Sequence, residues 1–166
     1  MKTLIILCLA LVLTPCFAAK ADQEHDYPPD DSLITLTFPD SWDVKVKNGR
    51  LYASPAGDSG LFVEVSALES SPEQSEEAIK EAKASIEESF HDVTYDPLQS
   101  TEINTLGVNV INAKGVDKEG KANINAVLIV HPKSKRIFMM LAISSQEAFE
   151  KHGEVIPKII ESLKPK

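Results

Sequence analysis

The sequence predicts an α+β domain in which an antiparallel β-sheet carries helices on both faces, an α/β/α sandwich. Apolar and polar residues alternate over much of residues 33–65 and 108–144, which is typical of antiparallel strands. Two segments with helical periodicity, residues 71–90 and 144–163, follow these strand blocks. Because each helix must bury its apolar stripe on a sheet, this order predicts one domain over residues 33–166.

The first block of alternation predicts four strands joined by short turns. Pro39 ends the first of them. Asn48 and Gly49 both tolerate positive φ, so they predict a two-residue hairpin between the second and third strands. The four expected strands span residues 34–38, 44–46, 51–53 and 61–65.

A long amphipathic helix is expected next. Ser71 suits the N-cap, Pro72 suits the first helical position, and Gln74 completes a capping box. Four apolar side chains then share one side of the helix, which predicts that it packs a single stripe on the sheet. These side chains are Ile79, Ala82, Ile86 and Phe90.

The second block predicts the centre of the sheet. A strand at residues 108–113 and a hairpin turn at residues 117–120 come first. Two long strands follow, at residues 122–131 and 136–144, and both are apolar on nearly every residue in their middles. Strands of this kind need cover on both faces, so we expect them to be central.

A second amphipathic helix is expected after these strands. Ser144 suits its N-cap, with Glu147 three residues later. Gly153 and Pro157 interrupt the helical pattern, since a proline removes one backbone hydrogen bond and clashes with the preceding turn. We therefore expect a kink there, or two consecutive helices.

Residues 1–21 have the features of a cleaved signal peptide. A positive start precedes an unbroken apolar run at residues 4–13, which is too short to span a bilayer core of about 30 Å. Small residues allow cleavage after Ala18 or after Ala21, and we favour the second, so a periplasmic or secreted protein with no transmembrane segment is expected. A lipid anchor on Cys16 is the alternative, which the preceding Pro15 disfavours.

Composition narrows the class of partner. The chain has a formal net charge of −8, so it is repelled by nucleic acid and no nucleic-acid partner is expected. Both cysteines, Cys8 and Cys16, precede the favoured cleavage site, so the mature chain has no disulfide or thiolate site. Residues 22–32 are acidic, contain two prolines and have Tyr27 as their one aromatic residue. We expect them to form a flexible leader.

Two short motifs resemble those of a known group of exported domains. The segment from Phe38 to Trp42 (Phe-Pro-Asp-Ser-Trp) resembles the start of PsbP-like and DcrB-like domains, and the segment from Ile159 to Lys164 (Ile-Ile-Glu-Ser-Leu-Lys) resembles their end. The resemblance implies an antiparallel α/β/α sandwich used for binding or assembly, and no catalytic residues carry over. The residues expected to be structural are Phe38, Pro39 and Trp42.

Two motifs suggest chemistry but lack the partners that the chemistry needs. Residues 57–60 (Gly-Asp-Ser-Gly) match the nucleophile loop of trypsin-like proteases. Ser59 would need a histidine base, and the one histidine that precedes it, His25, lies in the expected leader. Asp117 to Gly120 resembles the start of a calcium loop, whose twelfth position would be Leu128 instead of a bidentate acid. Neither motif is expected to be a site.

Histidines and asparagines are the remaining candidates. The four histidines are not spaced as metal ligands, and the acids around His25 are better explained as a solvated tail than as a cation site. Asn123 and Asn125 point to one side of an expected central strand. They would line a cleft or pair with the neighbouring strand, and we favour the pairing. No catalytic residue, cofactor site or metal site is expected. The other histidines are His91, His131 and His152.

Together these features predict an exported binding or assembly module of the cell envelope that is not an enzyme. Its expected partner is another envelope protein. The alternative is a small periplasmic hydrolase or metal-dependent enzyme. The two hypotheses differ in whether titratable groups converge in one concave site.

Overall fold

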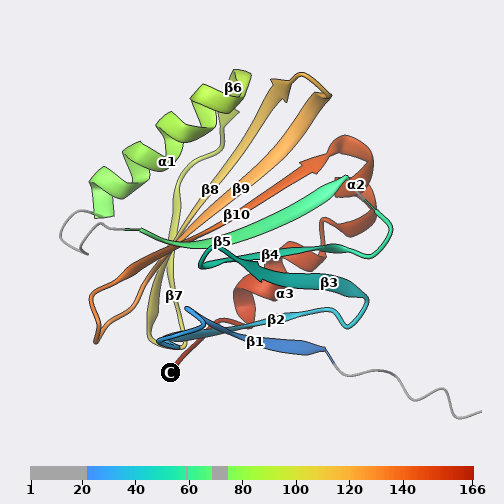
Figure 1. Ribbon diagram of the computed structural model, residues 1–166. Helices are drawn as coiled ribbons and strands as arrows, with labels where there is room; N and C mark the ends of the chain where they lie inside the picture. Colours follow the sequence, from blue (N-terminus) through green and yellow to red (C-terminus); the bar gives the residue numbers. More distant parts are fainter. Residues whose placement is uncertain (1–21, 59, 69–74) are drawn as a thin grey trace, which may run out of the picture.

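The computed structural model describes residues 22–58, 60–68 and 75–166, which form two antiparallel sheets and three helices (Figure 1). The expected signal peptide, Ser59 and the expected N-cap of the first helix lie outside these ranges. The strands are β1 (Gln23–Tyr27), β2 (Ile34–Phe38), β3 (Trp42–Lys47), β4 (Arg50–Pro55), β5 (Leu61–Leu68), β6 (His91–Tyr95), β7 (Gln99–Ile103), β8 (Leu106–Asp117), β9 (Gly120–Val130), β10 (Ile137–Ser145) and β11 (Lys164–Pro165), and the helices are α1 (Ser75–Ser89), α2 (Gln146–His152) and α3 (Val155–Glu161).

The larger sheet has the strand order β3-β4-β5-β10-β9-β8-β6. The predicted central position of β9 and β10 is confirmed, because β10 pairs with β5 on one side and with β9 on the other. The predicted hairpin between β3 and β4 is also confirmed, with Asn48 and Gly49 at φ values of 52° and 73°. β6 and β7 share the far edge of β8. The antiparallel α+β class predicted from the sequence is confirmed.

Helix α1 packs on the larger sheet through small side chains. Its buried residues are Ala78, Ala82 and Ile86, and they cluster with alternate residues of β9 such as Ile124 and Leu128. Two alanines allow the helix axis to approach the sheet closely. Of the predicted stripe, Ile79 is only partly buried, and Ala78 takes its place in the contact.

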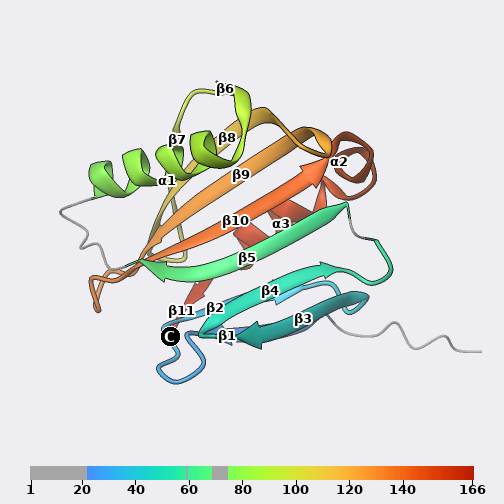
Figure 2. The ribbon, with the colours of Figure 1, turned by 45° about the horizontal axis from the view of Figure 1, so that its top comes forward.

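A second cluster lies on the other side of β9, because successive strand residues point to opposite faces. Val127 and Ile129 belong to it, together with Ile156 and Ile159 of α3 and Phe38 of β2. The three-stranded sheet β1-β2-β11 therefore shares this cluster with α3 (Figure 1, Figure 2). The predicted single sheet with helical cover was too simple, since strands 34–38 and 44–46 belong to different sheets.

The prediction of a flexible leader at residues 22–32 was wrong, because Gln23–Tyr27 forms β1 and pairs with β2. Tyr27 is 1% exposed, and its hydroxyl donates to the Gly49 carbonyl at 2.7 Å. Gln23 Nε2 donates to the Trp42 carbonyl at 3.0 Å. Acidic composition indicated a solvated tail, but alternate side chains of this segment face the second cluster while the acids face water.

The final helical segment is divided, as one of the two predicted outcomes allowed. Helix α2 ends before Gly153, and α3 begins at Val155 with Pro157 in its first turn, where a missing N–H costs least. The N-cap is Ser145, one residue later than predicted, and it accepts from the Ala148 N–H at 3.1 Å. No helix in the described part of the chain is long and apolar enough to cross a membrane.

Candidate functional site

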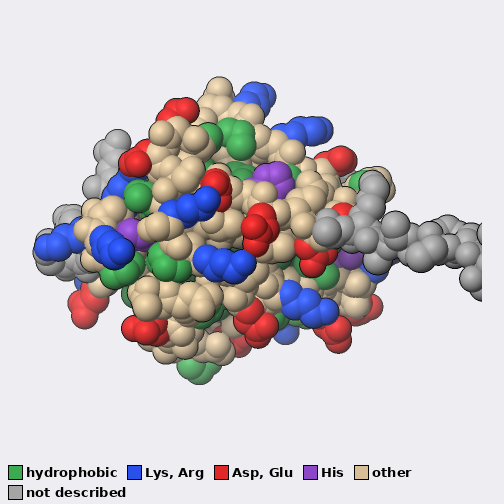
Figure 3. Space-filling model, turned by 90° about the horizontal axis from the view of Figure 1, so that it is seen from below, with side chains coloured by type: hydrophobic (Ala, Val, Ile, Leu, Met, Phe, Trp, Pro, Cys, Tyr) green, Lys and Arg blue, Asp and Glu red, His purple; other side chains and the backbone are tan. Residues whose placement is uncertain are grey.

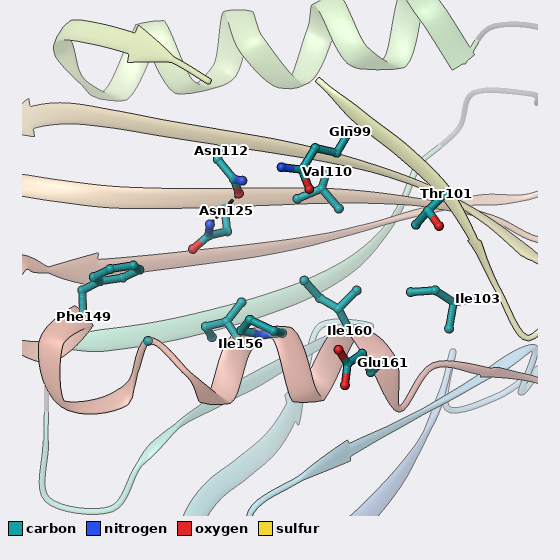
Figure 4. A pocket seen from close by; sticks show the side chains of 12 residues that line it. Gln99, Thr101, Ile103, Val110, Asn112, Asn125, Phe149, Ile156, Ile160 and Glu161 are labelled. Carbon is teal, nitrogen blue, oxygen red and sulfur yellow. Dashed lines mark hydrogen bonds between the residues drawn. The ribbon is translucent and has the colours of Figure 1, made fainter. Parts of the chain in front are cut away.

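A groove of about 410 Å³ runs between the α2–α3 segment and strands β7, β8 and β9 (Figure 4). Its strand side presents one residue or more from each of these strands, such as Thr101 of β7, Val110 of β8 and Asn125 of β9. Its helix side presents Phe149 and Ile160. Phe149 is 39% exposed, although it is a large apolar side chain. The groove is therefore largely apolar, with polar groups confined to a few positions.

The groove exists because α3 covers only part of this sheet face. Strand β7 lies beyond the helical cover, and all its side chains except Ile103 are exposed. The β7–β8 turn holds Asn104 and Thr105 at φ values of 49° and 72°, which is the geometry of a tight two-residue hairpin. Asn104 Nδ2 donates to the Leu163 carbonyl at 2.8 Å, so this turn is tied to the end of α3. That bond fixes one end of the groove.

Two amides lie in the middle of the groove. Asn125 Nδ2 donates to Asn112 Oδ1 at 2.7 Å, across paired positions of β9 and β8. Figure 4 shows the Asn125 carbonyl oxygen turned toward the helices. Among the described residues no hydrogen bond reaches this oxygen or Asn112 Nδ2. Asn125 thus both pairs with the neighbouring strand and lines the groove.

Asn123 lies in a separate hollow of about 390 Å³ at the end of the β8–β9 hairpin. Its Nδ2 donates to Gln146 Oε1 at 3.4 Å, a long and weak bond between β9 and the start of α2. Lys114 and Lys121 line the same hollow. The two asparagines predicted as possible cleft residues therefore belong to two neighbouring hollows on one face of the sheet.

The Gly-Asp-Ser-Gly loop does have a histidine beside it, which sequence reasoning missed. His152 Nε2 lies 3.1 Å from Asp58 Oδ2, and Lys151 Nζ lies 2.9 Å from the same oxygen. The Lys151 ammonium, with the Gly60 N–H and His152, holds the pKa of Asp58 well below its usual range. This cluster ties the β4–β5 loop to α2. Ser59 itself lies outside the described residues.

The other histidines occupy separate places. His131 is 2% exposed, and its Nδ1 accepts from the Ser134 N–H at 3.1 Å. Burial lowers the pKa of His131. His25, predicted to lie in a solvated tail, instead stacks edge-on against Phe38 at 5.9 Å, and burial lowers its pKa too. His91 is exposed at the start of β6. Within the described residues, no three metal-ligating side chains converge.

Of the residues expected to be structural, Phe38 and Trp42 belong to the second cluster and Pro39 is partly buried beside them in the chain. Phe38 and Trp42 are buried, with ring centroids 6.1 Å apart. The Pro39 carbonyl accepts from Gln23 Nε2 at 3.2 Å, so it receives part of the β1 contact.

Solved structures share this architecture at low sequence identity. The PsbP protein of Synechocystis sp. PCC 6803 (CyanoP) matches with a TM-score of 0.61 and 7% identity over 93% of this chain and 99% of its own. The chain has a PsbP-type fold. LpqN of Mycobacterium tuberculosis, described as involved in cell envelope biogenesis, matches at 0.60 and 10% identity over 88% of this chain and 91% of its own. The Saccharomyces cerevisiae Ran-binding protein Mog1p matches with a TM-score of 0.56 and 7% identity over 86% of this chain and 94% of its own.

These likenesses establish the fold alone. No protein-family model matches the chain, and no curated protein matches its sequence. The resemblance predicted from the two short motifs is thus confirmed at the level of structure.

Proposed function

We propose that the protein is an exported, non-enzymatic binding or assembly module of the cell envelope, and that the groove between β7–β9 and α2–α3 holds a segment of another envelope protein. One observation carries this proposal. Half-buried apolar side chains line an open groove whose central amides keep a donor and an acceptor without a partner among the described residues. Binding sites of this composition gain affinity from apolar burial and orientation from a few polar groups.

The apolar side chains of the groove are accessible without unfolding. Ile103, Val110 and Ile160 are partly buried against the second cluster, and Phe149 stands at the rim. A bound segment would remove their remaining exposed surface from water at roughly 25 cal/mol per Å². Aromatic side chains, Phe among them, are enriched at protein interfaces, so the exposed ring of Phe149 is an expected contact for the bound segment.

Export is supported by the sequence of residues 1–21 and by the position of β1. Cleavage after Ala21 would leave β1 whole, since this strand begins at Gln23. The similar fold of LpqN, described as involved in cell envelope biogenesis, favours a role in the envelope, and the similar fold of the Ran-binding protein Mog1p favours protein binding. N-terminal sequencing of the exported form should find Asp22 first, and a diacylated Cys16 would contradict this.

Site-specific photo-crosslinking in living cells tests the groove. A photoreactive amino acid placed at Thr101 or at Glu161, two exposed groove positions on different elements, should capture the same partner. The same amino acid at Lys80, on the exposed side of α1, should not capture it. Mass spectrometry of the cross-linked product identifies the partner.

A matched pair of substitutions completes the test. Phe149→Ser should remove most of the cross-linking from Thr101, because it deletes the apolar rim of the groove. Phe62→Ser removes a similarly exposed aromatic ring, 37% against 39%, from a different part of the surface and should leave cross-linking intact. Equal capture by both variants, with unchanged thermal melts, would place the partner elsewhere.

A further inference from the structure

We propose that Lys114 and Lys121 bind a carboxylate of the groove's occupant, so that the partner presents an extended apolar peptide segment with an acidic residue at one end. This inference rests on the proposed function and adds the chemistry of the partner. The hollow that the two lysines line, about 390 Å³, adjoins the groove on the same face of the larger sheet.

The two lysines stand close together on neighbouring strands. Lys114 pairs with Asn123, and Lys121 pairs with Val116, so the lysines are diagonal neighbours on one face. Long side chains at diagonal positions are within reach of each other, so the two positive charges repel. Within the described residues neither lysine forms an ion pair, although Asp92 also lines the hollow. An anion placed between them would relieve the repulsion.

Three other lysines, Lys151, Lys164 and Lys166, do form ion pairs. Lys164 and Lys166 are neutralised by Glu24 and Asp26, at 2.9 Å and 2.7 Å. The face seen from below in Figure 3 likewise intersperses basic and acidic side chains. With a net charge of −8, the protein repels anions in general. A paired positive site beside an apolar groove therefore supplies a local complement to an acidic ligand.

The groove and the hollow follow one another along β8. Val110 and Asn112 line the groove, and Lys114 and Val116 line the hollow, at alternate positions of the same strand. At about 3.4 Å per residue, Val110 and Lys114 lie about 14 Å apart along the strand. An extended peptide of about five residues spans that length, with apolar side chains over the groove and a carboxylate over the lysines.

The amide pair favours a peptide over a lipid chain. Asn112 Nδ2 and Asn125 Oδ1 offer one donor and one acceptor, which match the C=O and N–H of a peptide group. An acyl chain has neither, so it would bury both amides without partners, which is costly. The groove thus selects a polypeptide, and the lysines select its charge.

Panning a phage-displayed random heptapeptide library on the exported protein tests both selections. Wild type should enrich peptides that combine apolar residues with Asp or Glu. The double variant Lys114→Gln/Lys121→Gln should keep the apolar enrichment and lose the acidic one. Its affinity for an enriched acidic peptide, measured by fluorescence polarisation, should fall about tenfold, since two ion pairs are lost. Lys45→Gln/Lys47→Gln on β3 makes the same charge change on an exposed strand and should behave as wild type.

The outcomes separate this inference from the proposed function. The carboxylate site is wrong if the peptides enriched by wild type show no preference for acidic residues, or if the double lysine variant keeps that preference. In either case the groove function stands as long as Phe149→Ser abolishes the enrichment of apolar peptides. If wild type enriches no peptide, or binds vesicles of phosphatidylglycerol instead, both proposals fail. Thermal melts of each variant confirm that it is folded.

Discussion

The two faces of the larger sheet are covered differently, and β9 shows the difference within one strand. Toward α1 it presents Ile124, Ala126 and Leu128, all buried in one apolar cluster. Toward α2 and α3 it presents Val127 and Ile129, but also Asn123 and Asn125. One face of this strand is therefore pure core, while the other changes from core to groove halfway along its length.

This difference follows from the shape of the cover. Helix α1 is continuous over its 15 residues and places alanines against the sheet. The α2–α3 segment is broken at Gly153 and is shared with the three-stranded sheet, so it leaves β7 and part of β8 uncovered. Amides occur where the cover ends, because there they can reach a ligand or water. The groove therefore forms because the α2–α3 segment covers this face incompletely, and the strands supply its polar groups.

The face of the larger sheet that packs on α3 and the three-stranded sheet should be a stabilising core wherever it lies outside the groove. Trp42→Ala should lower the free energy of unfolding by roughly 3–5 kcal/mol, because the ring is 4% exposed and packs on Phe38. Val46→Ala on the same strand is the control, since Val46 is 51% exposed, and it should have little effect. Urea unfolding measures both. An unchanged midpoint for Trp42→Ala, with lost partner binding, would make the ring a contact for the partner.

A smaller effect tests whether β1 belongs to that core. Tyr27→Phe should cost about 1 kcal/mol, because it deletes the hydrogen bond from the hydroxyl to the Gly49 carbonyl. Tyr52→Phe is the matched control, because Tyr52 is only partly buried and its described contact is the ring of Phe62. Equal stability of the two variants would show that the hydrogen bond from β1 to the Gly49 carbonyl contributes little.

A pH dependence of stability should arise from two histidines, the buried His131 and the partly buried His25. Burial lowers the pKa of His131 and of His25 from the ordinary value of 6.5. Below pH 6.5 the unfolded chain therefore binds more protons than the folded protein, so stability falls as the pH decreases toward the lowered folded pKa. Urea midpoints at pH 7.5 and 5.5 measure the slope. His131→Gln should reduce it, whereas His91→Gln, at an exposed site, should not; equal slopes in both variants would contradict the assignment.

Much of the fold could be predicted because it depends on local patterns. The apolar runs in β9 and β10 predicted their central place, and Asn48-Gly49 predicted its hairpin. Strands β6 and β7 were missed because they are edge strands with exposed side chains, which leave little apolar alternation to detect. Strand β1 was missed because its burial depends on pairing with β2 in a second, three-stranded sheet that the sequence pattern does not predict.

The site was harder to predict, because it joins residues far apart in the chain. The spacing of Asn123 and Asn125 correctly suggested one face, but the second hollow needs Lys114 and the groove needs Phe149. The signal that was available is the polar interruption of an otherwise apolar strand face. Likewise, His152 lies 94 residues from Asp58 in the chain, so the search for a histidine upstream of the loop could not find it.

Replacing the two amides that interrupt the apolar face toward α2 and α3 separates their role in binding from their role in stability. Asn112→Val/Asn125→Val should leave stability nearly unchanged or slightly higher, because both partners of one hydrogen bond become apolar together. Peptide binding should weaken, since the free donor and acceptor are lost. The single variant Asn125→Val should be less stable than the double, because it leaves the Asn112 amide without its partner. If the double variant is strongly destabilised, the amides belong to the core and are not a feature of the groove.

The smallest effect is expected at the loop that most resembles a catalytic motif. Ser59→Ala and His152→Ala should each leave partner binding intact, because the proposed function needs the groove and not turnover. His152→Ala should also change stability little, since Asp58 keeps its bonds to Lys151 and to the Gly60 N–H. The measurement is photo-crosslinking from Thr101, with a thermal melt of each variant. Lost cross-linking in either variant with an unchanged melt would contradict this prediction and would favour the rival hypothesis of a small hydrolase, in which Asp58 would orient His152 as a base for Ser59.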